Sequence, residues 1–357
     1  MADRRAFLVA LLAPSGCNRP ERPQATGNAD PASSRPTTAS VARTTGAEAT
    51  PSVPRVAMLS FSSPNAVSPA GPPVADSLRD RLARLGRVDG RTIVLDERYA
   101  KGDPQRIERL AQDIVESKPD IIVAIGALAT GAARQATATI PIVMVHAGNP
   151  VEAGFAVSLS HPGGNVTGTT SMAQDLGHKQ VELLGQLVPR LRRLGVLTNP
   201  TNVGSPKTLV NVREAALRYG IDVTVAEVTR REEFDAAFAR LKAARTDALY
   251  VAIDSVIFVN AAAVLEFTAA NRLPASFDVG GRELVRRGAL MSYGPVLTTH
   301  FAIAAEYVDK ILRGARPGDL PVQQPTEFAL FINSKTAAAL GIAIPQSLLQ
   351  RADEIVG

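Results

Sequence analysis

The chain has 357 residues, a formal net charge of +5 and 45% hydrophobic residues. At roughly 150 residues per domain, this length predicts two domains with sizeable cores and excludes a chain that is disordered throughout. Only 4% of the residues are aromatic and none is Trp, so the cores must be mainly aliphatic, which suits parallel sheets covered by helices. No block of Lys and Arg interleaved with aromatic residues occurs, so we expect no nucleic-acid partner.

Cysteine and histidine usage argues against a metal or redox centre. Cys17 is the only cysteine, which excludes an internal disulfide and any multi-cysteine metal site. The four histidines, His146, His161, His178 and His300, lack the spacing of metal ligands. We therefore expect no metal and no cofactor.

The amino terminus has the pattern of an export signal, predicted over residues 1–17. Arg4 and Arg5 precede an apolar run over residues 6–13 that is too short to span a bilayer. Ser15-Gly16-Cys17 resembles the end of a lipoprotein signal, in which the cysteine is lipidated; the alternative is an ordinary signal peptide with an incidental cysteine. We expect a mature protein that is periplasmic or anchored on the extracytoplasmic side of the membrane.

Residues 18–54 predict a disordered tether, because they are rich in Pro, Ser, Thr and Ala and nearly free of large apolar side chains. From Arg55 onward, runs typical of strands and helices alternate. Predicted strands cover 55–61, 92–100, 120–126 and 140–148, and helices 74–85, 104–117 and 129–138; strands over 192–200, 221–228, 246–254 and 272–280 and helices over 207–219 and 232–244 repeat the order. The pattern predicts two doubly wound α/β lobes with parallel sheets.

In such sheets ligands bind beyond the carboxyl ends of the strands, and the ends of two lobes can face one another across a cleft. Asp254 and Asp278 would hold a ligand ammonium there, or would cap helices. Phe61 and Tyr293 would flank an apolar ligand side chain, or would pack in the cores. The candidate ligand-binding residues are Ser60, Phe61, Ala127, Ala129, Thr130, His146, Asn149, Thr198, Asn199, Asp254, Asp278 and Tyr293.

The loop after the strand over 120–126 begins like a phosphate-binding loop but lacks its chemistry. Ala132 and Ala133 follow Gly131 where a phosphate loop has Lys and Ser or Thr, and Leu128 replaces a glycine of the dinucleotide fingerprint. What remains is a helix start, expected at Ala129–Thr130, that suits a carboxylate or another small anion. The alternative is that Gly126 only permits a tight turn.

Catalytic motifs are absent from the sequence. It contains neither a G-x-S-x-G nucleophile elbow nor an H-E-x-x-H metal motif. His146 and Asp278 are the best general-base candidates, but no residue near either in sequence pairs with it. We therefore expect a protein that is not an enzyme.

Several strings together resemble the ABC-transporter substrate-binding proteins of the tryptophan/tyrosine-binding type. These strings are GDPQRIERLAQDIVESKPDIIVAIG, ATIPIVMVHAGNPVEAGFAVSLSHPGGNVTG, RGALMSYGP and YVDKILRGARPGDLPVQQPTEFALFINSKTAAALGIAIPQSLLQRADEIV. The resemblance runs from about Arg55 to the carboxyl terminus. It implies a periplasmic-binding-protein fold of the first type, with three chain crossings at a hinge that closes on a small ligand.

The resemblance also implies a division of the chain and a partner. The first lobe would comprise residues 55–170 and about 299–325, and the second 171–298 and about 326–357. We expect a monomer that delivers its small-molecule ligand to an ABC permease. Family members often carry GTPAA where this chain has GALAT, so the hydroxyl is displaced to Thr130, and this chain has no Trp to stack on an aromatic ligand.

Two alternatives remain open. A sensory receptor subunit would use the same fold to report a ligand to a partner kinase, and the neighbouring genes would distinguish it from a transport protein. An α/β enzyme acting on a sugar or nucleotide would need a paired acid and base, which the sequence does not contain.

Overall fold

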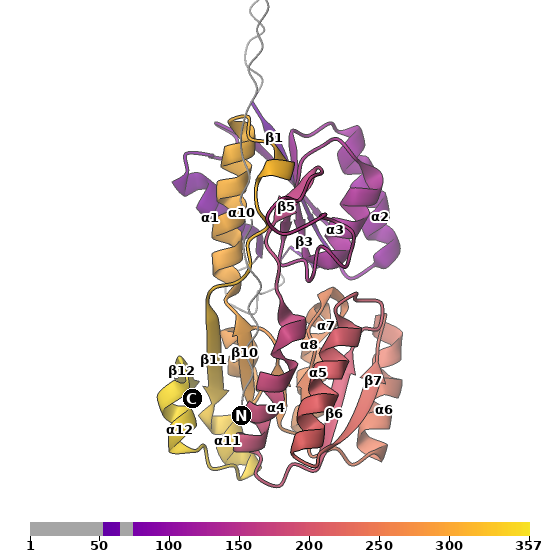
Figure 1. Cartoon of the computed structure of the whole chain (residues 1–357), viewed down its shortest axis with the longest axis vertical. Helices are drawn as coiled ribbons and strands as arrows, with labels where there is room; N and C mark the ends of the chain where they lie inside the picture. The colour runs from indigo at the N-terminus through magenta and orange to yellow at the C-terminus, as the bar shows by residue number, and fades with distance from the viewer. Residues whose placement is uncertain (1–52, 65–73) are drawn as a thin grey trace, which may run out of the picture. The chain divides into compact units, whose positions relative to one another are not determined.

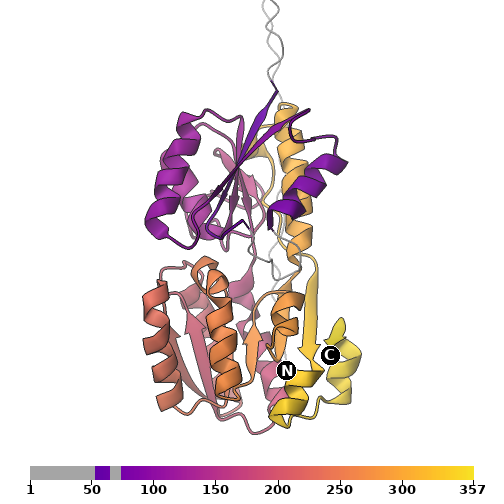
Figure 2. The same cartoon turned by 180° about the vertical axis from the view of Figure 1, so that it is seen from behind.

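The computed structural model describes residues 53–64 and 74–357, which form two α/β sheets (Figures 1 and 2). The predicted export signal, Cys17 and nearly all of the predicted tether lie outside the described residues. Within the described residues, no helix is both long enough and apolar enough to cross a bilayer.

The first sheet has five parallel strands in the order β2-β1-β3-β4-β5. Strands β1, β3 and β4 are buried on both faces, which explains their nearly continuous apolar sequences, whereas the edge strand β2 is partly exposed and carries charged residues. Helices α2 and α3 pack on one face, and α1 and α10 pack on the other. The elements are β1 (Arg55–Ser60), α1 (Val74–Arg84), β2 (Val94–Tyr99), α2 (Pro104–Glu116), β3 (Ile121–Ile125), α3 (Gly126–Ala136), β4 (Ile142–Val145), β5 (Val166–Gly168) and α10 (Leu297–Leu312).

The second sheet has seven strands in the order β12-β11-β10-β9-β8-β6-β7, all parallel except for the antiparallel pair β10 and β11. Helices α4 and α5 cover one face, and α6 and α8 the other. The elements are α4 (Gly177–Leu187), β6 (Arg193–Thr198), α5 (Ser205–Arg218), β7 (Asp222–Glu227), α6 (Phe234–Ala243), β8 (Ala248–Val251), α7 (Ser255–Val259), α8 (Ala261–Ala270), β9 (Ala275–Phe277), α9 (Arg282–Arg286), β10 (Met291–Pro295), β11 (Phe328–Asn333), α11 (Ser334–Leu340), α12 (Gln346–Arg351) and β12 (Glu354–Val356).

The predicted fold class is confirmed, with one boundary that matters for the site. The sequence places the start of α3 at Ala129, but the helix begins at Gly126, directly after β3. Gly126 has φ of +82°, a conformation that glycine adopts easily, so the chain turns from strand into helix without a loop. The amino terminus of α3 therefore lies at the edge of the sheet.

Three segments carry the chain between the sheets. The first follows β5, the second joins β10 to α10, and the third precedes β11. Two of these segments pair with each other: the Gln323 N–H donates to the Gly168 carbonyl at 2.9 Å, and the Thr170 N–H donates to the Gln323 carbonyl at 3.0 Å. This pairing forms a short hydrogen-bonded strap between the lobes.

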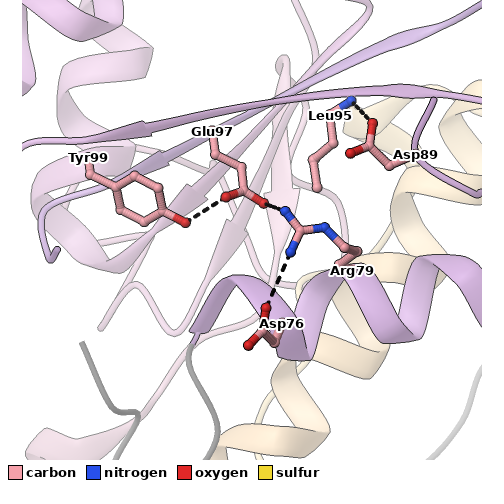
Figure 3. Close-up of polar contacts among 6 residues, drawn as sticks. All are labelled: Asp76, Arg79, Asp89, Leu95, Glu97 and Tyr99. Carbon is pink, nitrogen blue, oxygen red and sulfur yellow. Dashed lines mark hydrogen bonds and ion pairs between the residues drawn. The ribbon is translucent and has the colours of Figure 1, made fainter. Parts of the chain in front are cut away.

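A polar network fastens α1 to the edge strand β2 (Figure 3). Arg79 of α1 donates to Asp76 at 3.2 Å and forms an ion pair with Glu97 of β2. The Tyr99 hydroxyl donates to Glu97 at 2.8 Å, and burial together with this carboxylate raises the pKa of Tyr99. These residues are occupied with one another and lie outside the pocket described below, so their role is structural.

Candidate functional site

A pocket of about 240 Å³ lies where the carboxyl ends of strands from both sheets meet. Residues that follow β1, β3 and β4 line it from the first sheet, and residues that follow β6, β8 and β9 line it from the second. This is the position at which open α/β sheets bind ligands. Small-molecule sites typically have roughly 300 to 1,000 Å³, so the pocket suits a small ligand.

The start of α3 forms part of the first-lobe wall, through Gly126, Ala127 and Leu128. Ile125 at the N-cap position offers no side-chain hydrogen bond to the helix. The first N–H groups of a helix have no intrahelical acceptor and lie at the positive end of the helix dipole. This part of the wall therefore suits an anion.

Ala129 and Thr130 lie outside the residues that line the pocket, one turn further into α3. Both are fully buried. The Thr130 hydroxyl donates to the Gly126 carbonyl at 2.8 Å, a bond within the helix that uses the donor predicted for the ligand. The prediction placed the anion-binding end too late in the chain because it placed the start of α3 three residues too late.

Asp254 is half-buried in the second-lobe wall and caps α7, as the alternative reading of the sequence expected. Its Oδ1 accepts a hydrogen bond from the Ile257 N–H at 2.8 Å, and its Oδ2 accepts one from the Asn199 amide. Burial raises the pKa of Asp254 to about 6, although these two donors act in the opposite direction. The residue is thus both a helix cap and part of the pocket.

Asp278 follows β9 and is 2% exposed. Its Oδ1 accepts from the Ile253 N–H at 2.7 Å and its Oδ2 from the Tyr250 hydroxyl at 2.8 Å. Burial raises the pKa of Asp278 to about 7, and the charge of Asp254 adds to this rise. The second-lobe wall therefore holds two carboxyl groups with raised pKa values. A cation would stabilise their charged forms.

His146 lines the pocket at the end of β4 in a left-handed conformation, with φ of 57°. Its ring makes an edge-to-face contact with that of His300 on α10, with centroids 5.1 Å apart, and its buried Nδ1 has no hydrogen-bond partner within the described part of the chain. Burial, and secondarily His300, lowers the pKa of His146 well below its usual value. A ring that is so hard to protonate is a poor general base.

The aromatic part of the wall differs from the prediction. Phe61 lines the pocket as expected, together with Phe155, Phe258 and Phe301. Tyr293 lies outside the lining residues: its ring stacks on Phe328 at 6.2 Å and packs against the core of the second sheet. The alternative of core packing therefore holds for Tyr293.

The other predicted residues divide in the same way. Ser60, Ala127, Asn149 and Asn199 line the pocket. Thr198 does not; it is fully buried and its hydroxyl donates to Ser205 at 3.1 Å. Among the described residues, no group of three or more His, Cys, Asp or Glu side chains is arranged to hold a metal ion.

Sequence reasoning missed several lining residues that do not directly follow a predicted strand. Phe258 belongs to the short helix α7, Phe155 lies in the long connection after β4, and Phe301 lies on α10 after a hinge crossing. The aromatic identity of the three phenylalanines was the only available signal. An aromatic residue in a helix is more often a core residue, so this signal was weak.

Two α/β sheets with a small pocket between their carboxyl ends, joined by three chain crossings, define a periplasmic-binding-protein-like fold. A family model described as ABC transporter substrate binding protein matches residues 68–356. The chain belongs to this family. Its family and relatives are binding proteins rather than enzymes.

Individual relatives agree with this assignment. The chain is 31% identical over 259 residues to a tyrosine-binding protein of Clostridioides difficile (strain R20291), which covers 72% of this chain and 74% of the relative. It is similar to the structure of an ABC domain from Streptococcus pneumoniae in complex with L-Trp, with a TM-score of 0.76, 25% identity and coverage of 85% of this chain and 100% of the other. A conserved domain protein from Vibrio cholerae also has a TM-score of 0.76, with 28% identity and coverage of 84% and 99%.

Proposed function

We propose that this protein captures an aromatic amino acid outside the cytoplasm and delivers it to an ABC permease. The observation that carries the proposal is the chemistry of the pocket, which combines two carboxyl groups on one wall, a helix amino terminus on the other and four phenylalanine side chains. A free amino acid has the matching ammonium, carboxylate and side chain. The relatives in C. difficile and S. pneumoniae, with tyrosine and L-Trp in their descriptions, support this ligand class.

The ammonium group is assigned to Asp254 and Asp278. Each carboxyl oxygen already accepts one hydrogen bond from the protein, but a carboxylate oxygen can accept a second. Asp254 is the more accessible of the two, so it would contact the ammonium directly while Asp278 adds its charge from behind. Burial raises the pKa values of both residues, so an ammonium group beside them would stabilise their charged forms.

The carboxylate of the ligand is assigned to the start of α3, at Gly126 to Leu128. Backbone N–H groups and the helix dipole favour an anion there. The ligand side chain would then lie beside Phe61, Phe155 and Phe258, where ring stacking and apolar contact favour an aromatic group. These contacts come from both lobes, so closure about the hinge would complete the site.

The cellular role follows from the family and from the sequence. The export signal predicted over residues 1–17, with Cys17 as a possible lipid anchor, would bring the mature chain to the extracytoplasmic side of the membrane. The first lobe would comprise residues 55–170 and about 299–325, and the second 171–298 and about 326–357. Hinge closure would be the working step of a monomeric protein, which would present the closed form to the permease.

A thermal-shift screen tests the ligand class. The purified protein is heated with each amino acid, with sugars and with nucleosides. A ligand at ~100 times its dissociation constant stabilises a protein by about 2.7 kcal/mol, which is a clear shift. We expect shifts with L-tyrosine, L-tryptophan or L-phenylalanine that weaken in Asp254→Asn. A shift with a sugar and none with any amino acid would contradict the proposal.

A further inference from the structure

The start of α3 in the first lobe and the start of α7 in the second meet across the pocket. A Cβ atom built on Gly126 would lie 2.7 Å from the Ser255 Oγ, and no other atom of the described residues outside its own chain neighbours and its own helix would come within 4 Å. Gly126 and Ser255 both line the pocket. This contact therefore forms one edge of the ligand site, with the Gly126 backbone of the first lobe on one side and the Ser255 hydroxyl of the second lobe on the other.

A second contact lies at the other end of α7. A Cβ atom on Gly102, in the loop after β2, would lie 3.5 Å from Val259 Cγ2. Gly102 and Gly126 both have positive φ, of +83° and +82°. The short helix α7 thus lies against the first lobe at both of its ends, and in both places the first lobe presents a glycine.

The hydroxyl of Ser255 meets a helix end that has no cap of its own. Ile125, at the N-cap position of α3, contributes no side-chain hydrogen bond. Serine is among the residues that cap helices best, because its oxygen accepts hydrogen bonds from the first backbone N–H groups. The adjacent Asp254 already caps α7, so Ser255 is not needed for that purpose.

We propose that Ser255 is a positioning residue for lobe closure: its hydroxyl lies at the start of α3 without a hydrogen bond to it in this structure and, on further closure, accepts from one of the free N–H groups there, which leaves the others to the ligand carboxylate. Gly126 is required because a side chain there would hold the two helices apart. The proposal rests on the proposed function only in its premise that closure captures the ligand. The cap forms only when the lobes approach, so it favours the closed state over the open one. A ligand that binds the closed state gains affinity by the same factor.

The size of the effect follows from the strength of an ordinary helix cap. Removing a serine cap changes a helix-forming equilibrium by roughly 2- to 30-fold. We therefore expect Ser255→Ala to weaken the affinity for L-tyrosine or L-tryptophan by a factor in this range. Ser255→Thr keeps the hydroxyl and should restore most of the affinity, which a purely steric role for Ser255 would not predict.

A double-mutant cycle separates the cap from the space that Gly126 leaves. Gly126→Ala adds a methyl group against the Ser255 hydroxyl and strains the backbone, so we expect a larger loss than that of Ser255→Ala. In the double variant the only close atom is gone. The two losses should therefore be less than additive. Gly86→Ala is the control for backbone strain, because Gly86 has φ of +80° with no atom within 4 Å.

The closure itself is measured by the distance between spin labels at exposed positions, Glu108 on α2 and Lys242 on α6, in a Cys17→Ser background. Without ligand, Gly126→Ala should shift the distances toward longer values than Gly86→Ala does, which tests the contact even if the protein binds no amino acid. Additive losses, or label distances in Ser255→Ala and Gly126→Ala that equal those of the wild type, would overturn the proposal. Failure of the wild type alone to bind amino acids would instead overturn the proposed function.

Discussion

Replacing Asp278 by Asn tests whether the pocket holds a carboxyl group whose charged form is unfavourable until a cation binds beside it. The asparagine oxygen can still accept from the Ile253 N–H, and its amide can donate to the Tyr250 oxygen, so the geometry of the site should survive. The variant lacks the ionisable group. We expect ligand-free Asp278→Asn to be more stable than the wild type above pH 7 and to depend less on pH.

The size of the effect follows from the pKa. The pKa of Asp278 is about 7 in the folded protein and about 3.8 in the unfolded chain, where the carboxyl group is exposed to water. Between these two pH values the folded state holds a proton that the unfolded state has released. The free energy of unfolding therefore falls as pH rises from about 4 to about 7. At 1.36 kcal/mol per pKa unit the largest possible fall is about 4 kcal/mol. Asp254, with a pKa of about 6, also lowers the free energy of unfolding as pH rises, and Asp278→Asn retains this second contribution.

Ligand affinity should have the opposite pH dependence: it should rise with pH, whereas the stability of the ligand-free protein falls. An ammonium group beside the carboxylates favours their charged forms, so binding below pH 7 releases protons. The affinity of the wild type for L-tyrosine or L-tryptophan should rise as pH increases from 5 to 7, by at most about tenfold per pH unit for each carboxyl group that titrates. Asp278→Asn should bind more weakly and show a shallower rise.

Urea unfolding at pH 5, 6, 7 and 8 measures the stability profile, and calorimetry in buffers of different ionisation enthalpy counts the protons released on binding. Asp247→Asn is the matched control. Burial alone would raise the pKa of Asp247, but hydrogen bonds from the Arg193 side chain and the backbone outweigh it and hold the pKa below 3.8. Asp247 is then ionised in both the folded and the unfolded state from about pH 5 to 8, so this variant should be less stable than the wild type by an amount that does not change with pH in that range. Parallel profiles for Asp278→Asn and the wild type from pH 5 to 8 would refute the reasoning.

Three further substitutions and one control test other parts of the structure. Burial lowers the pKa of His300 to about 4, so the wild type should lose up to about 3 kcal/mol as pH falls from 6.5 to 4, and His300→Leu should lack this loss in acid unfolding curves. Gly168→Ala should cost more than about 3 kcal/mol in urea unfolding, because its Cβ would lie 2.0 Å from a backbone oxygen of β4; Gly185→Ala, in open space on α4, should stabilise by up to about 1 kcal/mol. Thr130→Val should change ligand affinity by less than about twofold in calorimetry and should lower the stability by about 1 kcal/mol, because the Thr130 hydroxyl bonds within the helix. A large loss of affinity would show that Thr130 contacts the ligand after all.

The fold was predictable because its signals are local and repeated. Strands that are buried on both faces need continuous apolar sequences, and helices between them need apolar residues at helical spacing. The same rule placed the candidate site at the strand ends, and Phe61, Asp254 and Asp278, chosen on that basis, line the pocket. An aspartate directly after a strand is often a helix cap, and Asp254 caps α7 as well as lining the pocket.

The errors come from side-chain direction, which the position of a strand end does not determine. Tyr293 turns its ring to Phe328 and the second core, and its strand β10 contributes no residue to the pocket lining. Thr198 and Asn199 show the same effect at the end of β6, where only Asn199 reaches the pocket. An error of one residue in register exchanges the two faces, and strand boundaries are not predicted that accurately from one sequence.

Contacts between the two lobes also could not be predicted from the sequence, for a different reason. Gly126 is equally consistent with a tight turn, an anion-binding loop and a close approach by another segment, and its own neighbours in the sequence do not distinguish these. Only the position of Ser255 on the other lobe does so. The positive φ of Gly126 explains why the chain turns there, and the Ser255 hydroxyl, which would lie 2.7 Å from a Cβ atom at this position, would have to move to admit a side chain. The second reason exists only when both lobes are placed together, and it links the start of α3, where the ligand carboxylate is assigned, to the helix that Asp254 caps.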